Sequence, residues 1–355
     1  MNTRQISELA RDLPAADRRT ILKGLGGAGL ALPIAGFFAN HAAHAQDQTP
    51  TPPGAPIGSG GEQPGTGAGT PIPQPPAAFT PIDPVLAPVQ PGPKQVTLTA
   101  QETTVYVAQG VAYAGWSFNG TIPGPAQRLV VGDDVTVTVR NQAAMQHSLD
   151  THAAQTPPDV NYPIVNPGQE YAWHFTPNFP GAFMYHCGTP PVLMHIGAGM
   201  YGAMVVDPPG GWPPAQELVF VQSEFYLLDG PNGVKTPDFA KLMQYGALDY
   251  VAFNGYANQY VEHPIPVKVG EPIRIFVVNA GPNTWSSFHV VGAIFDAAYA
   301  NANPANKVVG LQSMTIGPGD GACVELTLKE PGTYPAVNHA FGHAQHGAIA
   351  LLQAS

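Results

Sequence analysis

The sequence has few cysteines and few charges, and each shortage excludes a class of protein. Cys187 and Cys323 are its only cysteines, so a framework of disulfides does not hold the 355 residues together. Charged residues make up 11% of the chain, with 14 basic against 24 acidic side chains and a formal net charge of −10. Because no basic cluster offsets this acidity, we exclude nucleic-acid binding and expect the surface to favour a basic partner protein.

Long hydrophobic runs are also missing, apart from a short one near the N-terminus. Residues 17–23 read Asp-Arg-Arg-Thr-Ile-Leu-Lys, a twin-arginine pattern, and an apolar, Gly-rich run follows at 24–38. That run is too short, and too broken by Gly and Pro, to span a membrane. Ala43-His-Ala45 then offers small residues for cleavage. We therefore expect residues 1–45 to be a twin-arginine signal peptide that sends the protein to the periplasm or another exported location.

Glycine and proline are abundant, with 40 residues of each. Residues 46–94 are rich in Pro, Gly, Thr and Gln and have few large apolar side chains, which predicts a disordered tether. Further along, Gly and Pro separate short alternating runs, such as Val-Thr-Val-Thr-Val-Arg at 135–140. A period of two is typical of antiparallel strands with one solvated face.

These alternating runs form two cycles of similar plan. Val131-Gly-Asp in the first cycle resembles Val269-Gly-Glu in the second, and the Pro-rich segment 207–214 lies between them. The sequence therefore predicts an all-β protein with two tandem β-sandwich domains, at residues 95–209 and 210–355.

A cysteine, a histidine and a methionine follow one of the predicted strands in close succession. Residues 181–188 read Gly-Ala-Phe-Met-Tyr-His-Cys-Gly, and His195 and Met200 come next. A blue copper site uses two imidazoles, one thiolate and a weak axial thioether, so His147, which lies far upstream, is the candidate for the missing imidazole. The alternative is a buried, inert cysteine beside incidental histidines. The spacing favours copper, which also explains how a lone thiol is protected after export.

Neighbouring side chains on this strand point to opposite faces. If Cys187 points into its own sandwich, His186 points out of it, and Asp150 and His152 reach the same outer face. Two outward imidazoles make an incomplete metal site, so a third must come from elsewhere. The candidates in the second domain are His289 and His339.

The other histidines and the second cysteine have simpler interpretations. Cys323 alternates within a predicted strand and is expected to be a small core residue. Surface or loop positions are expected for His174, His263, His343 and His346.

Six segments, taken together, resemble the copper-containing nitrite reductases. The gap between Cys187 and His195 is similar to the family branch with the shorter copper-binding loop. The resemblance covers both domains, from about residue 95 to the end. The segments are Phe118-Asn-Gly-Thr-Ile-Pro-Gly-Pro, His147-Ser-Leu-Asp-Thr-His-Ala-Ala, Tyr185-His-Cys, Met194-His-Ile-Gly-Ala-Gly-Met-Tyr-Gly, Ser287-Phe-His-Val-Val-Gly and Val337-Asn-His.

The resemblance implies two cupredoxin-like Greek-key sandwiches in a homotrimer that reduces nitrite to nitric oxide. It implies one type 1 and one type 2 copper per subunit. Asp150 and His289 deliver protons in this scheme, and a small donor protein, a cytochrome c or a cupredoxin, supplies the electron. The type 1 ligands are then His147, Cys187, His195 and Met200; the type 2 ligands are His152 and His186 of one chain and His339 of the next.

Two other functions fit part of the pattern. A small laccase-like multicopper oxidase needs several His-x-His pairs, which the sequence lacks, and a histidine where Gly188 follows the copper cysteine. A non-catalytic two-domain electron carrier would lack one of the type 2 histidines, and all three are present. The segment Gln155–Pro158 and Val291 depart from the family's usual residues, and both bear on the shape of the pocket. We interpret the chain as an enzyme, a copper nitrite reductase.

Overall fold

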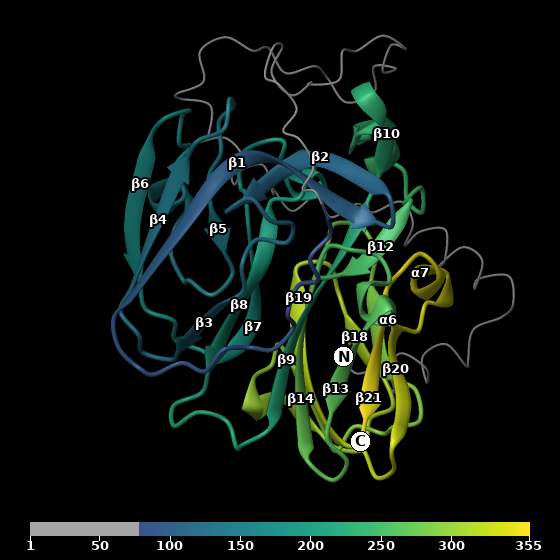
Figure 1. The fold of residues 1–355 in the computed structure, drawn as a ribbon. Coiled ribbons are helices and arrows are strands. Elements are labelled where there is room, and N and C mark those ends of the chain that lie inside the picture. Colours follow the sequence, from purple (N-terminus) through teal and green to yellow (C-terminus); the bar gives the residue numbers. More distant parts are fainter. Residues whose placement is uncertain (1–77) are drawn as a thin grey trace, which may run out of the picture. The chain divides into compact units, whose positions relative to one another are not determined.

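The computed structural model describes residues 78–355, and their strands form four β-sheets (Figure 1). The expected signal peptide, 1–45, and residues 46–77 of the expected tether lie outside the described residues. Within 78–355, no helix is both long enough and apolar enough to cross a bilayer. The prediction of an all-β fold is confirmed. The helices are short: α3 (Pro158–Asn161), α4 (Val192–Ala198), α5 (Phe239–Leu242), α6 (Gln259–Glu262), α7 (Phe341–Gln345), and the 3-10 turns η3 (Pro231–Gly233) and η4 (Pro304–Asn306).

The first sandwich consists of a six-stranded sheet and a four-stranded sheet. The larger sheet has the order β10-β11-β2-β1-β4-β6, in which β1 runs antiparallel to β2 and parallel to β4. The smaller sheet has the order β3-β8-β7-β5. The strands are β1 (Lys94–Ala108), β2 (Val111–Phe118), β3 (Gln127–Val130), β4 (Val135–Asn141), β5 (Asp150–Thr151), β6 (Glu170–Phe175), β7 (Gly181–His186), β8 (Tyr201–Asp207), β10 (Leu227–Asp229) and β11 (Lys235–Pro237).

The second sandwich, coloured green to yellow in Figure 1, has a six-stranded and a five-stranded sheet. Their orders are β12-β9-β14-β19-β16-β17 and β13-β21-β20-β15-β18. The strands are β9 (Gln216–Phe225), β12 (Tyr250–Phe253), β13 (His263–Val267), β14 (Pro272–Gly281), β15 (Ser286–Val290), β16 (Ala297–Ala300), β17 (Lys307–Val308), β18 (Met314–Ile316), β19 (Asp320–Thr327), β20 (Gly332–Asn338) and β21 (Ile349–Ala354).

Alternation explains how each strand contributes to a core. In β4, the valines at 135, 137 and 139 are buried, while the threonines between them are partly exposed. The buried residues on the inner faces of the first sandwich form one cluster, to which Trp116, Phe118 and Cys187 belong. A second cluster around Phe220, Phe253 and Phe288 fills the other sandwich. Each sandwich thus has a core of its own.

A third apolar cluster joins the two sandwiches. It contains Met184 from β7 together with Val221, Phe276 and Cys323 from the second sandwich. The strands approach closely here: a Cβ atom on Gly321 of β19 would lie 2.0 Å from the carbonyl oxygen of Ala182 in β7, so only glycine fits. The strand that carries the copper-site motif is therefore packed on both faces.

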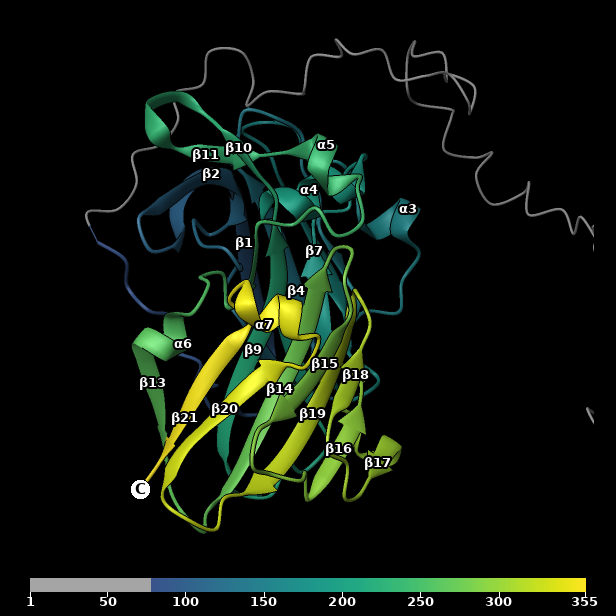
Figure 2. The ribbon, with the colours of Figure 1, turned by 90° about the vertical axis from the view of Figure 1, so that its right-hand side faces the viewer.

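Residues 227–242 leave the second sandwich and pack on the first. The β10–β11 hairpin extends the sheet next to β2, and α5 contacts α4 (Figure 2). The reason is local packing: a Cβ atom on Gly197 of α4 would lie 2.5 Å from the Leu242 side chain of α5. The domain division at residue 210 stays a prediction. Residues 227–242 follow this boundary in the chain, yet they pack on the first sandwich.

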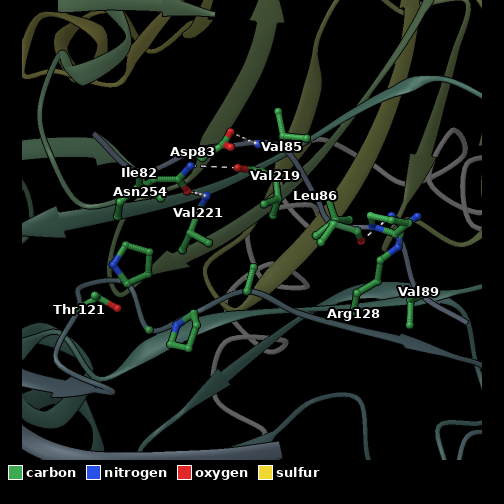
Figure 3. Close-up of a pocket in the computed structure, with 16 residues that line it drawn as sticks. Ile82, Asp83, Val85, Leu86, Val89, Thr121, Arg128, Val219, Val221 and Asn254 are labelled. Atoms are coloured by element: carbon green, nitrogen blue, oxygen red, sulfur yellow. Dashed lines mark hydrogen bonds between the residues drawn. The ribbon is translucent and has the colours of Figure 1, made fainter. Parts of the chain in front are cut away.

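The C-terminal part of the expected tether is ordered against both sandwiches, unlike a disordered spacer. Leu86 is buried and donates a backbone hydrogen bond to Glu217, and Phe79 stacks on Tyr256. Leu86 lines a cavity of about 540 Å³. Figure 3 shows Ile82, Asp83, Val85, Leu86 and Val89 of this segment at that cavity, which Arg128 also borders. Its lining contains no histidine or cysteine. Residues 79–89 contain enough apolar side chains to offset the conformational entropy that this segment loses when it becomes ordered. The average composition of residues 46–94 is polar and rich in Gly and Pro, so it did not reveal this local apolar group.

A buried ionic network also connects the sandwiches. Glu217 accepts from Arg128 of the first sandwich and from Arg274 of the second, each at 2.8 Å. Arg128 also pairs with Asp207 at 3.0 Å, and Arg274 with Glu325 at 2.6 Å. The Arg274 side chain is only 2% exposed. Its charge is therefore compensated on two sides, as burial of a cation requires.

Replacing Arg274 by Met should lower the free energy of unfolding by about 3 kcal/mol, because two carboxylates lose a buried partner. Arg140→Met is the matched control, since the Arg140–Glu170 pair lies at the surface with side chains 48% and 59% exposed. Its loss should cost less than about 1 kcal/mol. Chemical denaturation followed by fluorescence measures both. Equal losses would show that the buried network contributes no more than a surface pair.

Candidate metal centres

The end of β7 separates two neighbouring side chains as the sequence predicts. Tyr185 and Cys187 belong to the core of the first sandwich, whereas Met184 belongs to the cluster between the sandwiches. His186 lies on the side of Met184 and joins Asp150 and His152. Adjacent residues therefore enter two different clusters of metal-ligand side chains.

The first cluster brings three predicted ligands together in the core. The Nδ1 atoms of His147 and His195 are 3.2 Å apart, and the Cys187 Sγ atom lies 3.7 Å from the first and 3.3 Å from the second. Three donors bound to one copper ion, at about 2.0 Å for nitrogen and about 2.3 Å for sulfur, lie about 3.5 Å apart when the ion is in their plane. The spacing of the three atoms fits copper.

Met200 reaches the same core through the loop that follows α4. The Cys187 N–H donates to the Met200 carbonyl at 3.1 Å, and the Met200 N–H donates to the His195 carbonyl at 3.1 Å. Gly199 permits this path, because its φ is +123° and a Cβ atom there would lie 2.4 Å from the Ile122 side chain. The Met200 side chain is fully buried in the same cluster as Cys187. It is therefore available as the axial ligand.

Burial sets the protonation of this cluster. It lowers the pKa of His147 to about 3, helped by the neighbouring His195, and lowers the pKa of His195 to about 4. Both imidazoles are thus neutral ligands at neutral pH. Burial also raises the pKa of the Cys187 thiol, against hydrogen bonds from Ser148 and Thr189 that favour the thiolate. A bound cation would stabilise the negative charge of the Cys187 thiolate, which the apolar core alone does not stabilise.

The second cluster lies at the outer face. The Nε2 atoms of His152 and His186 are 3.2 Å apart, and an Asp150 carboxylate oxygen lies 3.8 Å from His186 Nε2. The Nδ1–H of His186 donates to the Cys187 carbonyl, and that of His152 donates to the Gly319 carbonyl, both at 3.0 Å. These bonds leave both Nε2 lone pairs free for a metal. Burial lowers the pKa of His186, which keeps it neutral.

His289 and His339 lie next to each other on the second sandwich, with ring centroids 5.4 Å apart. The His289 Nδ1–H donates to the Gln312 carbonyl at 2.5 Å, and the His339 N–H donates to the Ser287 carbonyl at 2.7 Å. Within residues 78–355, neither imidazole joins the group of His152 and His186. One chain therefore brings together two of the three predicted ligands of the outer site.

Sequence reasoning missed two contributors to these clusters. The Trp116 ring lies 4.9 Å from the ring of His195 and 5.9 Å from that of His147, and shields them from one side. The Gly319 carbonyl orients His152 from the other sandwich. A Gly-Pro-Gly turn at 317–319 is visible in the sequence, but nothing local indicates its partner.

Cys323 and His174 lie where the simpler interpretations place them, whereas His263 begins strand β13 and His343 lies in helix α7, so neither is in a loop. Cys323 is fully buried in β19. His174 and His263 lie exposed on strands, while His343 is half-buried and bonded to Asn338.

In the metal-free protein, stability should fall as the pH falls from about 6.5, the ordinary histidine pKa. His147 and His195 remain neutral in the folded chain down to about pH 3 and 4. The unfolded chain binds more protons throughout that window, so acid favours unfolding. Denaturation midpoints measured across the window should fall less steeply in His147→Gln. His174→Gln, at an exposed position of β6, is the control. A slope in His147→Gln as steep as in the unsubstituted protein would contradict the assignment.

The chain resembles known copper proteins over most of its length. Residues 99–211 match the multicopper oxidase family. A copper-containing nitrite reductase of Neisseria meningitidis serogroup B is 34% identical over 273 residues, covering 74% of this chain and 69% of that protein.

Two solved structures agree with this relationship. A copper nitrite reductase of Nitrosomonas europaea is 38% identical, with a TM-score of 0.69, covering 74% of this chain and 94% of that one. A Cu-containing nitrite reductase of Thermus scotoductus is also 38% identical, with a TM-score of 0.67, covering 74% and 62%. The sequence identity, the fold and the two clusters of ligands agree: the chain belongs to the copper-containing nitrite reductases.

Proposed function

We propose that the protein reduces nitrite to nitric oxide at a type 2 copper that receives electrons from a type 1 copper. The reaction consumes one electron and two protons per nitrite and yields nitric oxide and water. One observation carries the proposal: Cys187 and His186 are joined by a peptide bond and enter two separate ligand clusters. A single covalent link thus connects an electron-accepting cluster to an outer cluster that anions can reach.

The type 1 ligands in this proposal are the buried set, His147, Cys187, His195 and Met200. Two neutral imidazoles, a thiolate and a thioether suit copper better than the hard cations that prefer oxygen. The dry core holds these side chains in one arrangement, so they need little rearrangement when the charge changes. Copper held by these residues would supply one-electron chemistry, and copper held by the outer set would bind nitrite.

The outer set is completed by His339 of the partner subunit, so the enzyme works as a homotrimer. His152 and His186 supply two imidazoles, and His339 lies beside exposed apolar side chains that a second copy would cover. Phe341 is 52% exposed with its ring 4.7 Å from that of His339, and Trp285 is 59% exposed. These features support an interface at His339, which gives each subunit one type 1 and one type 2 copper.

Asp150 and His289 are the proposed proton donors. The Asp150 carboxylate lies 3.8 Å from His186 Nε2, within reach of an anion bound beside that atom. The Gln312 carbonyl accepts from His289 Nδ1, so Nε2 of His289 is the nitrogen free to face a substrate. Two donors match the two protons that the reaction consumes.

The electron donor is proposed to be a small basic cytochrome c or cupredoxin, since the chain is acidic. The twin-arginine pattern supports export in folded form to the periplasm. A laccase-like oxidase is the weaker alternative, because no His-x-His pair is present to build a trinuclear centre.

Nitric oxide release from nitrite, measured without oxygen and with a reduced dye as the electron source, tests this function. Copper-loaded protein should release nitric oxide in proportion to the nitrite consumed. Absence of nitric oxide from protein that holds both coppers would overturn the proposal.

His339→Ala should empty the type 2 site and keep the blue colour, whereas Cys187→Ala should remove the colour and keep the type 2 copper. Electron paramagnetic resonance and the visible spectrum distinguish the two outcomes. Because the ligand crosses between subunits, mixing inactive His152→Ala and His339→Ala chains should restore activity in hybrid trimers. No recovery in verified hybrids would place all the ligands in one chain.

Asp150→Asn should keep both coppers and lower turnover on the order of a hundredfold, since an amide accepts hydrogen bonds but delivers no proton. Asp159→Asn, in the exposed helix α3 of the same sandwich, is the control for removing one acidic charge. Turnover at the unsubstituted level, with both coppers present, would reduce Asp150 to a structural role.

A further inference from the structure

The segment that carries Asp150 and His152 has very little sheet to hold it. Strand β5 consists of Asp150 and Thr151 alone and pairs with β7 at His186 and Tyr185. A strand of two residues gives weak control of orientation, because few hydrogen bonds fix it. The position of the carboxylate and of the imidazole must therefore depend on contacts beyond this pairing of two residues.

Those contacts converge on the peptide between Thr151 and His152. Its N–H donates to the Met184 carbonyl of β7 at 3.0 Å, and its carbonyl accepts from the Tyr162 hydroxyl at 3.1 Å and from the Ala154 N–H at 3.2 Å. The Thr151 hydroxyl, fully buried, points to the Met204 sulfur at 3.4 Å. Tyr162 is the partner that comes from neither strand of the pair nor the adjoining turn.

Tyr162 is itself held firmly. It follows α3, and its N–H donates to the Pro158 carbonyl at 3.0 Å. Its ring packs edge-on against Trp173, with centroids 5.1 Å apart. The segment Gln155–Pro158, which departs from the usual family residues, leads into this helix, and the Gln155 side chain accepts from Asn178 at 3.1 Å. The departure thus builds the support for Tyr162.

The hydroxyl of Tyr162 is a donor at any working pH. Burial, together with the negative charge of Asp150, raises the pKa of Tyr162 to about 12. The phenol therefore stays protonated, and its hydrogen bond to Thr151 does not switch off as the pH changes.

We infer that Tyr162 is a positioning residue for nitrite reduction: through the Thr151 carbonyl, its hydroxyl orients Asp150 and His152 toward the substrate. The inference rests on the proposed function, since it assigns the outer cluster to nitrite. Tyr162 contacts neither the metal nor the substrate. It acts on the backbone that joins the proton donor to the copper ligand, and a small rotation of that peptide moves both side chains together.

Tyr162→Phe tests this in the copper-loaded enzyme, because it keeps the ring against Trp173 and removes only the hydroxyl. Loss of one uncharged hydrogen bond should lower kcat about three- to tenfold. The type 2 signal in electron paramagnetic resonance should shift, while the type 1 absorption and the copper content stay unchanged and the melting temperature falls by no more than a few degrees, about the cost of one hydrogen bond. Tyr334→Phe is the matched control, since that half-buried tyrosine donates to the Glu330 carbonyl at 2.9 Å, at the far end of β20 from His339.

The outcomes separate this inference from the proposed function. An unsubstituted enzyme that releases no nitric oxide overturns the function. An active enzyme with identical kcat and type 2 signal in Tyr162→Phe overturns the inference alone. A loss of kcat that comes with a weaker type 1 absorption, or with a melting temperature lowered by more than about 5 °C, also overturns it, because the hydroxyl then stabilises the sandwich as a whole. Only a selective change at the type 2 site supports positioning.

Discussion

Consecutive side chains of a β-strand point to opposite faces, and this geometry separates Cys187 from His186 although one peptide bond joins them. The inward face of β7 meets an apolar core, and the outward face meets the second sandwich and the solvent beside it. A cysteine in a dry core and an imidazole at the outer face therefore occupy adjacent positions. Any shift of register by one residue would exchange them and destroy both clusters.

The core around Cys187 does more than exclude water. Burial keeps the imidazoles of His147 and His195 neutral and makes an uncompensated thiolate costly, so the cluster favours a cation that accepts sulfur. The second sandwich contributes to this enclosure through α5, which packs on the helix that carries His195. The two sandwiches are for this reason mutually dependent, and the ionic network around Glu217 and the ordered residues 78–93 join them at a distance from the metal clusters.

The sequence predicted what depends on local spacing and alternation. The all-β fold and the grouping of Cys187 with His147 and His195 follow from strand periodicity and from the loop that leads to His195. Contacts between segments distant in sequence were not predictable: the 227–242 excursion depends on the shape of α4, and the order of residues 78–93 depends on a surface formed by both sandwiches. The bond from Tyr162 to Thr151 belongs to the same class, because nothing near position 162 indicates its partner.

The placement of His152 illustrates how the second sandwich serves two purposes at once. Its turn at Gly319 accepts the Nδ1–H of His152 in the same chain, which leaves Nε2 free for a metal. Its own imidazoles, His289 and His339, lie together and outside that group within the described chain. The second sandwich thus orients His152 of the same chain with a backbone carbonyl, and in the proposed trimer its own imidazoles would face a neighbouring subunit. If the outer cluster takes its third imidazole from another copy, as we propose, assembly becomes a condition of activity, because one described chain brings only two imidazoles together there.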